Sequence, residues 1–318
     1  MSTLLLTQSQ IRELLDMQAV FSAVEDAFAA HGRNETLMPS KIYLSLPGKE
    51  GDFRAMPSYM HGAAGLKWVN AHPNNPQKHH LPTVMALFVL NDPDTALPLA
   101  VMDATLITAY RTGAAAGVAS KYLARETATT IGFVGSGVQA RFALEAHRVA
   151  ASKLDIRCAD LSEEAAQIFA RDVDGKAVSV QEACACDIVC TTTPSRTPVV
   201  KREWLAPGCH INAMGADAPG KQELSPAILS AARVYVDDVE QASHSGEINV
   251  PLHEGTFQSK DIVATLGQVV AEKSPGRQGN EITVFDSTGL ALQDLAVAKL
   301  LYERARSRNV GVEIDFLG

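Results

Sequence analysis

Several features that define other protein classes are missing from this chain of 318 residues. It has no apolar run of the about 18 residues that a membrane-spanning helix needs. Residues 1–15 lack the basic start of a secretory signal peptide, so we expect no such signal. The five cysteines are an odd number confined to residues 158–209, which does not fit a disulfide framework. We therefore expect a protein of the reducing cytoplasm.

A basic excess is also missing. Lys and Arg number 28 against 36 Asp and Glu, which gives a net charge of -8, and no block of basic residues occurs. Nucleic-acid-binding proteins usually carry a basic binding face, so we expect neither a nucleic-acid nor a membrane partner. The sequence shows no internal repeat and no low-complexity segment. At about 100–200 residues per domain, the length fits two globular domains.

The first part of the chain combines helices with short β-rich runs. Residues up to about 30 carry apolar side chains at helical spacing, with Thr7 as a candidate N-cap. Between residues 36 and 103, runs such as KIYLSL, GLKWVNAH and TVMALFVLN alternate with turn-forming segments, which predicts an antiparallel meander. Residues 104–124 are rich in alanine, which predicts a helix.

From about residue 125, strand-like and helix-like segments alternate, which predicts a parallel sheet with right-handed crossovers. We expect a helix at 259–273 and a last strand in EITVFDSTG. The final helix should pack on the N-terminal domain or on a partner subunit. The predicted fold class is therefore α/β. A Rossmann-type parallel-sheet domain spans 125–289, and an α+β domain with antiparallel strands is built from 1–124 and 290–318.

A glycine-rich loop marks a candidate nucleotide site. Gly135-Ser-Gly137-Val-Gln-Ala140 lies between a predicted strand and a predicted helix. In this context the two glycines permit a tight turn and close approach to a pyrophosphate, and the alanine keeps helix and strand close. Asp160 ends the next strand, where a carboxylate binds ribose hydroxyls and repels a 2′-phosphate. No arginine follows it, so the sequence predicts NAD rather than NADP.

Other polar residues follow the predicted strands of this domain. Threonines 191–193 close one strand on the expected adenosine side, or simply cap it. Residues 287–289 (Ser-Thr-Gly) could donate hydrogen bonds to nicotinamide or phosphate, or cap the final helix. Asp217 follows another strand, at the edge where open α/β sheets bind ligands. It is a candidate acid or base, or else a turn residue before Pro219.

Four basic residues of the N-terminal domain stand in apolar surroundings: Lys41, Arg54, Lys67 and Arg111. A buried cation is costly unless it is paired, so each residue either belongs to a site or extends its charge to the surface. Their number favours a site. Arginine can bind a carboxylate with two hydrogen bonds, and a desolvated lysine can act as acid or base near neutral pH.

The segment VDDVEQASHSGEIN contains possible metal ligands, namely Asp237, Asp238, His244 and Glu247. Their spacing fits no standard zinc motif, so we expect a hydrogen-bonded loop and no metal. The clustered cysteines are expected to be small core residues; they are Cys184, Cys186 and Cys190.

Over nearly its whole length the chain resembles the ornithine cyclodeaminase/μ-crystallin family. The motifs that carry the resemblance include MPSKIYL, DFRAMP, GLKWVNAHPNN, MDATLITAYRTGAAAG, GFVGSGVQA, HINAMGADAPGKQEL and FDSTGLALQD. Within the family the chain is most similar to the archaeal-type alanine dehydrogenases, which interconvert L-alanine with pyruvate and ammonia using NAD. The resemblance also implies a homodimer formed through the N-terminal domain and the last helix.

The resemblance implies roles for individual residues. Lys67 lies near the reacting carbon, and Asp217 is the acidic catalytic residue. The substrate carboxylate is held by Lys41, Arg54 and Arg111. We expect the cofactor to be bound by Arg111, Thr112, Gly135, Gly137, Val138, Gln139, Asp160, Thr191, Thr192, Thr193, Met214, Gly215, Ala216, Ser287, Thr288 and Gly289.

We therefore expect an NAD-dependent amino-acid dehydrogenase, or the related imino-acid reduction, with hydride transfer at the α-carbon. Ornithine cyclodeaminases share the motifs, but they have a longer C-terminal extension and read GGD at 215–217. Because this chain reads GAD and stops at Gly318, the dehydrogenase branch is favoured. The motifs do not distinguish the dehydrogenases from cyclic ketimine reductases or from opine-like enzymes. A non-catalytic μ-crystallin-like protein is a further alternative, which Lys67 and Asp217 disfavour.

Overall fold

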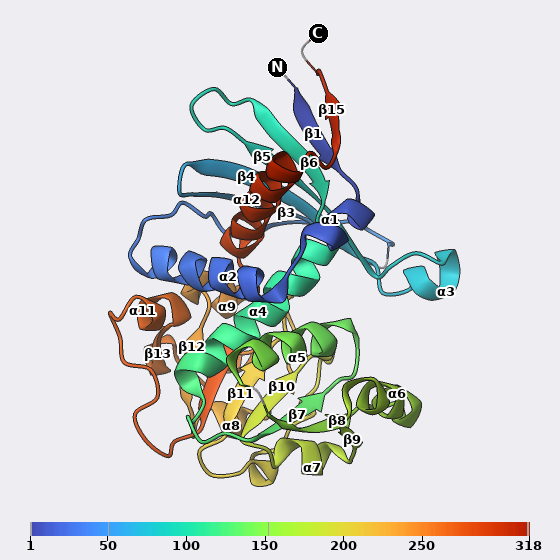
Figure 1. The fold of residues 1–318 in the computed structure, drawn as a ribbon. Coiled ribbons are helices and arrows are strands. Elements are labelled where there is room, and N and C mark those ends of the chain that lie inside the picture. The colour runs from blue at the N-terminus through green and yellow to red at the C-terminus, as the bar shows by residue number, and fades with distance from the viewer. Residues whose placement is uncertain (1, 50, 152, 317) are drawn as a thin grey trace. The chain divides into compact units, whose positions relative to one another are not determined.

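The computed structural model describes residues 2–49, 51–151, 153–316 and 318. They form two compact units, one with the residues up to Arg111 together with Leu290–Gly318, the other with Thr112–Gly289 (Figure 1). The division falls inside helix α4 (Thr105–Leu123), whereas the sequence placed a domain boundary after this helix. Within the described ranges, no helix is both long and apolar enough to cross a membrane.

A seven-stranded sheet, ordered β15-β1-β6-β5-β4-β3-β2, forms the centre of the first unit. The predicted antiparallel meander is confirmed as β2 (Ile42–Ser45), β3 (Asp52–Met60), β4 (Ala63–Ala71), β5 (Val84–Asn91) and β6 (Pro98–Asp103). β1 (Thr3–Leu6) lies parallel to β6 and antiparallel to β15 (Val312–Ile314). The prediction of helix from the start of the chain is therefore wrong for β1, because distant strands pair with it.

The helices of this unit are α1 (Gln8–Leu14), α2 (Met17–Gly32), α3 (Asn75–His79), the start of α4, and α12 (Ala291–Arg308). Thr7 caps α1 as predicted, in a capping box with Gln10. The last helix, α12, packs on α2 and on β3, β4 and β5, so it returns to the N-terminal domain. Figure 1 shows it across the sheet. Arg54 on β3 and Lys67 on β4 belong to the buried face of these strands.

The second unit contains eight parallel strands in the order β13-β12-β14-β11-β10-β7-β8-β9. They are β7 (Thr130–Val134), β8 (Asp155–Ala159), β9 (Lys176–Ala177), β10 (Ile188–Thr191), β11 (His210–Ala213), β12 (Arg233–Val236), β13 (Ile262–Thr265) and β14 (Thr283–Asp286). The chain passes from β7 outward to β9 and then returns to β10 on the other side of β7. The strand order therefore reverses between β7 and β10, and ligands of open α/β sheets bind at such a point.

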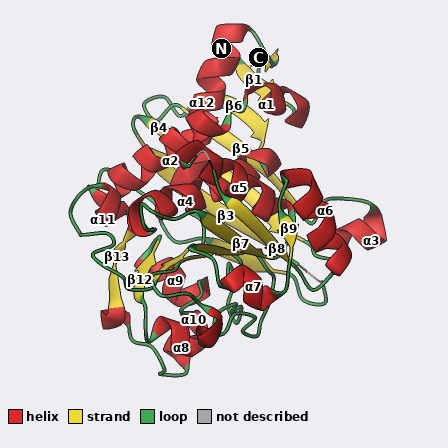
Figure 2. Cartoon of the chain, turned by 60° about the horizontal axis from the view of Figure 1, so that its bottom comes forward, coloured by secondary structure: helices red, strands yellow, loops and turns green. Residues whose placement is uncertain are grey.

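Helices cover both faces of this sheet (Figure 2). They are α5 (Val138–Ala150), α6 (Glu163–Val173), α7 (Val180–Cys184), α8 (Pro226–Leu229), α9 (Val239–Ser245), α10 (Asn249–His253) and α11 (Leu266–Val270). Phe133 of β7 packs with α5 and α6, whereas its neighbour Val134 belongs to the core with α7, α8 and α9. The predicted helix at 259–273 is wrong in its first half, where a short 3₁₀ turn (Ser259–Asp261) leads into β13. The five cysteines are buried and unbridged, as expected for core residues.

A chain of buried polar side chains lies between the sheet and the helices α4 and α5. His210 bonds Thr283 Oγ1 through Nδ1 at 2.9 Å and Asn212 Oδ1 through Nε2 at 3.2 Å. The side-chain amide of Asn212 donates through Nδ2 to Ser120 Oγ at 2.9 Å, and Ser120 Oγ lies 2.8 Å from His147 Nε2. Burial lowers the pKa of His147 to about 4 and that of His210 to about 3, so both rings are neutral at physiological pH.

The low pKa of His147 should make the folded protein sensitive to acid. In the unfolded chain His147 binds a proton below about pH 6.5, whereas in the folded chain it does so only near pH 4. Between these values the unfolded state binds more protons, so the free energy of unfolding falls as pH falls. His147→Gln should reduce this slope by up to about 1.4 kcal/mol per pH unit. Urea denaturation between pH 4 and pH 6.5 measures it. The exposed His253→Gln serves as control, and an unchanged slope in His147→Gln would contradict the assignment.

Candidate active site

The loop between β7 and α5 has the geometry of an anion site. Gly135 has φ +99°, and a Cβ on it would lie 2.9 Å from Thr192 Oγ1, so glycine is required. Gly137 is the N-cap of α5, and no described side chain caps this helix end. Open space surrounds the position of its missing Cβ. The free amides and the helix dipole at this end favour a phosphate group.

The residues after Gly137 extend this surface. Val138 is 63% exposed at the start of α5, whereas Ala140 is buried in the core below it. The Oε1 atom of Gln139 is buried and finds no hydrogen-bond partner in the described part of the chain. A buried acceptor without a partner is costly. A donor from a bound molecule would therefore be favourable here.

Asp160 follows β8 beside the glycine loop. Its Oδ2 atom accepts a hydrogen bond from the Ser136 amide at 2.7 Å, and its Oδ1 atom accepts one from the Ser162 amide at 3.0 Å. The carboxylate thus ties the loop to the end of the neighbouring strand. It is only partly buried and can accept further hydrogen bonds, as the predicted ribose contact requires.

The three predicted threonines lie at the end of β10 and directly after it, on the other side of β7. Their hydroxyl protons are engaged within the chain. Thr191 and Thr193 donate to Glu223 at 2.6 and 2.8 Å, and Thr192 donates to the Gly135 carbonyl at 3.1 Å. These side chains therefore shape the edge of the sheet. Because their protons are already used, their hydroxyl oxygens can only accept hydrogen bonds from a ligand.

Buried carboxylates hold the loops at this edge together. Glu223 accepts the amides of Thr193 and Gly215 at 2.6 and 2.8 Å, in addition to the two threonine hydroxyls. The backbone amide of Glu223 in turn donates to Glu247 at 3.0 Å, and the Glu247 amide donates to Asp286 at 2.8 Å. Burial raises the pKa of Glu223, and burial together with the Glu223 charge raises the pKa of Glu247 well above its ordinary value.

The loop after β11 carries Asp217, the predicted catalytic acid. Gly215 at its start cannot be replaced, since a Cβ would lie 2.1 Å from the Thr193 carbonyl. Ala216 is fully buried, and Met214 is partly exposed beside it. The side chain of Asp217 is 35% exposed and forms an ion pair with Lys221, four residues later in the same loop.

A further carboxylate organises the segment after β14. Asp237 accepts the amides of Thr288 and Gly289 at 2.6 and 2.7 Å, and the Thr288 hydroxyl at 3.1 Å. Its Oδ2 atom also lies 3.5 Å from Ser287 Oγ. The donors predicted for nicotinamide or phosphate are thus directed at Asp237. Asp237 and Glu247 thus accept hydrogen bonds from backbone amides of other segments. Among the described residues, no group of His, Cys, Asp or Glu side chains is arranged as a set of metal ligands.

In the first unit, two of the predicted cations share one buried carboxylate. Lys67 Nζ lies 2.6 Å from Asp294 Oδ2, and Arg111 Nε lies 3.1 Å from Asp294 Oδ1. Lys67 and Asp294 are fully buried, and Arg111 is 7% exposed. Burial and the nearby Arg111 charge lower the pKa of Lys67 to about 7, although Asp294 opposes this shift. A lysine that is about half protonated at neutral pH can both give and take a proton.

The other two cations are placed differently. Arg54 binds the carboxylate of Asp52 with Nε and Nη2 at 3.1 and 3.0 Å, and its guanidinium lies over the Tyr43 ring. Lys41 is near enough to Lys67 to contribute to its lowered pKa. The unit therefore gathers several positive charges on one side of its sheet, which favours an anionic ligand.

The sequence reasoning missed Asp294 and Glu223. It also missed Gln293, the neighbour of Asp294, which accepts a hydrogen bond from Arg111 Nη1 at 3.1 Å. Asp294 had a recognisable signal, because it interrupts the apolar run ALQDLAVAKLL just as Arg111 interrupts an apolar helix. Glu223 had none, since its partners are backbone amides and hydroxyls of other loops.

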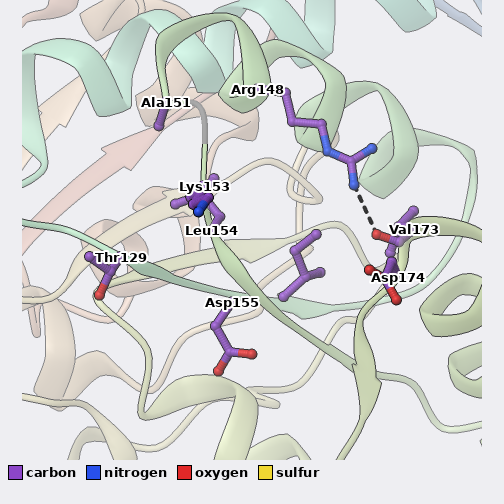
Figure 3. A pocket seen from close by; sticks show the side chains of 9 residues that line it. Thr129, Arg148, Ala151, Lys153, Leu154, Asp155, Val173 and Asp174 are labelled. Carbon is purple, nitrogen blue, oxygen red and sulfur yellow. Dashed lines mark hydrogen bonds between the residues drawn. The ribbon is translucent and has the colours of Figure 1, made fainter.

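A hollow at the opposite edge of the parallel sheet contains none of the predicted residues. Figure 3 shows its lining, which includes Thr129 before β7 and Asp155 at the start of β8. Arg148 donates to the Val173 carbonyl at 2.8 Å, as Figure 3 shows. Asp155 forms an ion pair with Lys176 at 3.1 Å. We assign this hollow no part in the site.

The parallel sheet, the glycine loop and Asp160 place the second unit among Rossmann-type α/β domains. The chain belongs to the ornithine cyclodeaminase/mu-crystallin family, whose model matches residues 1–309. The resemblance and the predicted fold class are confirmed.

Characterised relatives cover almost the whole chain. It is 51% identical to an alanine dehydrogenase of Archaeoglobus fulgidus, over 99% of both proteins. The structure of an archaeal alanine dehydrogenase dimer with bound NAD matches with a TM-score of 0.96 at 51% identity, over 100% of both chains. The Thermococcus litoralis Δ1-pyrroline-2-carboxylate reductase, solved with NADH and L-proline, matches with a TM-score of 0.93 at 35% identity, over 98% of this chain and 100% of the other.

The role of Glu223 as a buried acceptor can be tested by its removal. Glu223→Ala leaves the amides of Thr193 and Gly215 without an acceptor, and each unsatisfied buried donor costs about 1–3 kcal/mol. We expect the free energy of unfolding in urea to fall by at least that amount, and by less in Glu223→Gln. Glu240→Gln on the exposed side of α9 is the control and should change it by less than about 0.5 kcal/mol. Equal stability of Glu223→Ala and the wild type would contradict the role.

Proposed function

We propose that this protein is an NAD-dependent amino-acid dehydrogenase that converts L-alanine, water and NAD⁺ into pyruvate, ammonia and NADH. The observation that carries the proposal is the buried Lys67–Asp294–Arg111 cluster, in a chain 51% identical over 99% of its length to an alanine dehydrogenase. The unbridged, buried cysteines fit a cytoplasmic enzyme.

The second unit fits NAD. The uncapped amides of α5 and the open space at Gly137 suit the pyrophosphate, and the Asp160 carboxylate suits the ribose hydroxyls while repelling a 2′-phosphate. NAD, when bound, supplies the hydride acceptor. We propose that Val138, Gln139, Met214, Ala216 and the segments 111–112, 191–193 and 287–289 complete its binding site.

In the first unit we propose that Arg54, Lys41 and Arg111 bind the substrate carboxylate, which fixes the position of the α-carbon. Oxidation at this carbon produces an imine, and the addition of water to the imine releases ammonia. Lys67 would move protons at the nitrogen and at the attacking water. Asp217 would serve as the second acid or base.

A second candidate function is reduction of a cyclic imino acid. The similarity to a pyrroline-carboxylate reductase over 98% of the chain supports it. The two reactions share hydride transfer at a carbon that carries a carboxylate. They differ in whether the nitrogen is free ammonia or part of a ring.

We propose that the enzyme is a homodimer, as the archaeal relative is. The face of the antiparallel sheet opposite α12 supports this assembly. On it, Leu66, Trp68 and Leu87 are 37%, 40% and 54% exposed, and Trp68 pairs directly with Leu87 across β4 and β5. A second copy would cover these apolar side chains, which are costly in water.

Turnover assays test the function and the role of Lys67. The wild type should oxidise NADH with pyruvate plus ammonia, much more slowly with NADPH, and should form net NADH from L-alanine. Lys67→Ala should lower kcat by about 10²–10⁴-fold, the usual contribution of one acid–base group, while NADH affinity stays unchanged in a fluorescence titration. Activity with cyclic imines alone would show that the protein is an imino-acid reductase, the second candidate function. Turnover equal to that of the wild type in Lys67→Ala would refute the catalytic role of Lys67.

The dimer interface can be tested by light scattering. Leu87→Glu places a charge in the middle of the apolar sheet face, so we expect the mass in solution to fall from dimer to monomer. Leu161→Glu is the matched control, because this leucine is 98% exposed in the other unit and should leave the dimer intact. A Leu87→Glu variant that is still dimeric would place the interface elsewhere.

A further inference from the structure

The first turn of α12 brings two polar side chains to the cation cluster of the first unit. Asp294 gives one carboxylate oxygen to Lys67 and the other to Arg111, at 2.6 and 3.1 Å. Its neighbour Gln293 accepts a hydrogen bond from Arg111 Nη1 at 3.1 Å. All four side chains are at least nine-tenths buried. The arrangement fixes the nitrogen atoms of both cations relative to one helix.

The orientation of the Gln293 amide follows from its partners. Its Oε1 atom accepts both Arg111 Nη1 and the Leu290 amide, at 3.1 and 3.3 Å, and both partners can only donate. The Nε2 atom therefore points away from them, and it finds no hydrogen-bond partner among the residues that the structure describes. A purely structural ion-pair cluster would be expected to satisfy this donor.

The charges around the cluster do not balance. The ammonium group of Lys67 is acted on by Arg111 and Lys41, which oppose its charge, and by Asp294, which supports it. Asp294 thus pairs with two cations, Lys67 and Arg111, in a region with almost no solvent. An unpaired donor and an excess of positive charge both suit a substrate carboxylate, so the cluster has the properties of a binding site rather than of a core ion pair alone.

We propose that Asp294 is a positioning residue of the active site, which keeps a proton on Lys67 and holds Arg111 in the orientation that binds the substrate carboxylate. This inference rests on the proposed function. By this inference α12 contributes to the reaction through Asp294, because Lys67 and Arg111 need its carboxylate to perform their own roles. Without the Asp294 charge, Lys67 would face only Arg111 and Lys41, and would lose its proton at a lower pH.

Proton affinity of Lys67 is the quantity that distinguishes this role from simple packing. Lysine labelled with ¹³C at Cε allows its titration to be followed by NMR in the full-length protein with NAD bound. The Lys67 signal is identified by its absence from Lys67→Ala. We expect the midpoint in Asp294→Asn to lie at least one pH unit below that of the wild type. The limb of the kcat/KM profile that Lys67 governs should move by the same amount.

Two further variants separate charge from packing. Glu303→Gln removes one carboxylate from the exposed side of the same helix and should leave the Lys67 midpoint unchanged. Asp294→Glu keeps the charge one methylene further along, so it should retain the wild-type midpoint even where kcat falls. If Asp294→Asn does not fold, the proposal is tested with Asp294→Glu instead. A Lys67 titration midpoint that is lowered by one pH unit or more in this variant overturns the proposal.

An unchanged midpoint in folded Asp294→Asn also overturns the proposal. The NMR titration does not require turnover. A wild type that is inactive with every amino and imino acid would therefore refute the proposed function, while the effect of Asp294 on Lys67 would still be measured. Conversely, an active wild type with identical titrations in all variants would refute only the role of Asp294.

Discussion

Buried carboxylates that accept hydrogen bonds from several segments at once organise both units of this chain. A carboxylate loses its hydration on burial, so it is tolerated only where enough donors replace the lost water. Glu223 obtains four donors from two segments, the end of β10 with the residues after it and the loop after β11, and Asp237 obtains the amides that follow β14. In the first unit the donors of Asp294 are two side-chain cations. In each case one acidic side chain determines where several functional groups lie.

The two units use this interaction for different purposes. In the second unit the carboxylates hold backbone in place, and they leave the glycine loop as the surface where amides remain for a ligand. In the first unit the carboxylate is outnumbered by cations, so a net positive charge is retained. One unit is thereby suited to a phosphate-bearing molecule and the other to a small carboxylate, which is the combination that an amino-acid dehydrogenase needs.

Sequence patterns predicted the elements whose signals are local. The glycine loop, Asp160 and the β2–β6 meander depend on neighbouring residues and were recognised in place. The strand β1 was taken for helix because only pairing with β6 and β15 makes it extended. The same limit applied to the site. Lys67 was found by its apolar surroundings, but its counter-ion stands 227 positions away, a separation that no spacing rule covers.

The position of Asp294 near the end of the chain has a consequence for biosynthesis. Domains form as units while the ribosome extends the chain, and the second unit, Thr112–Gly289, is complete before α12 exists. Until α12 emerges, the sheet of the first unit holds Lys67 without its carboxylate and without the helix that covers its inner face. The segment of the second unit is therefore synthesised first, and Lys67 gains its carboxylate partner only in the last stage of synthesis. A chain that ends before α12 lacks both Asp294 and the helix that packs on this sheet, so the inner face of the sheet stays open to water.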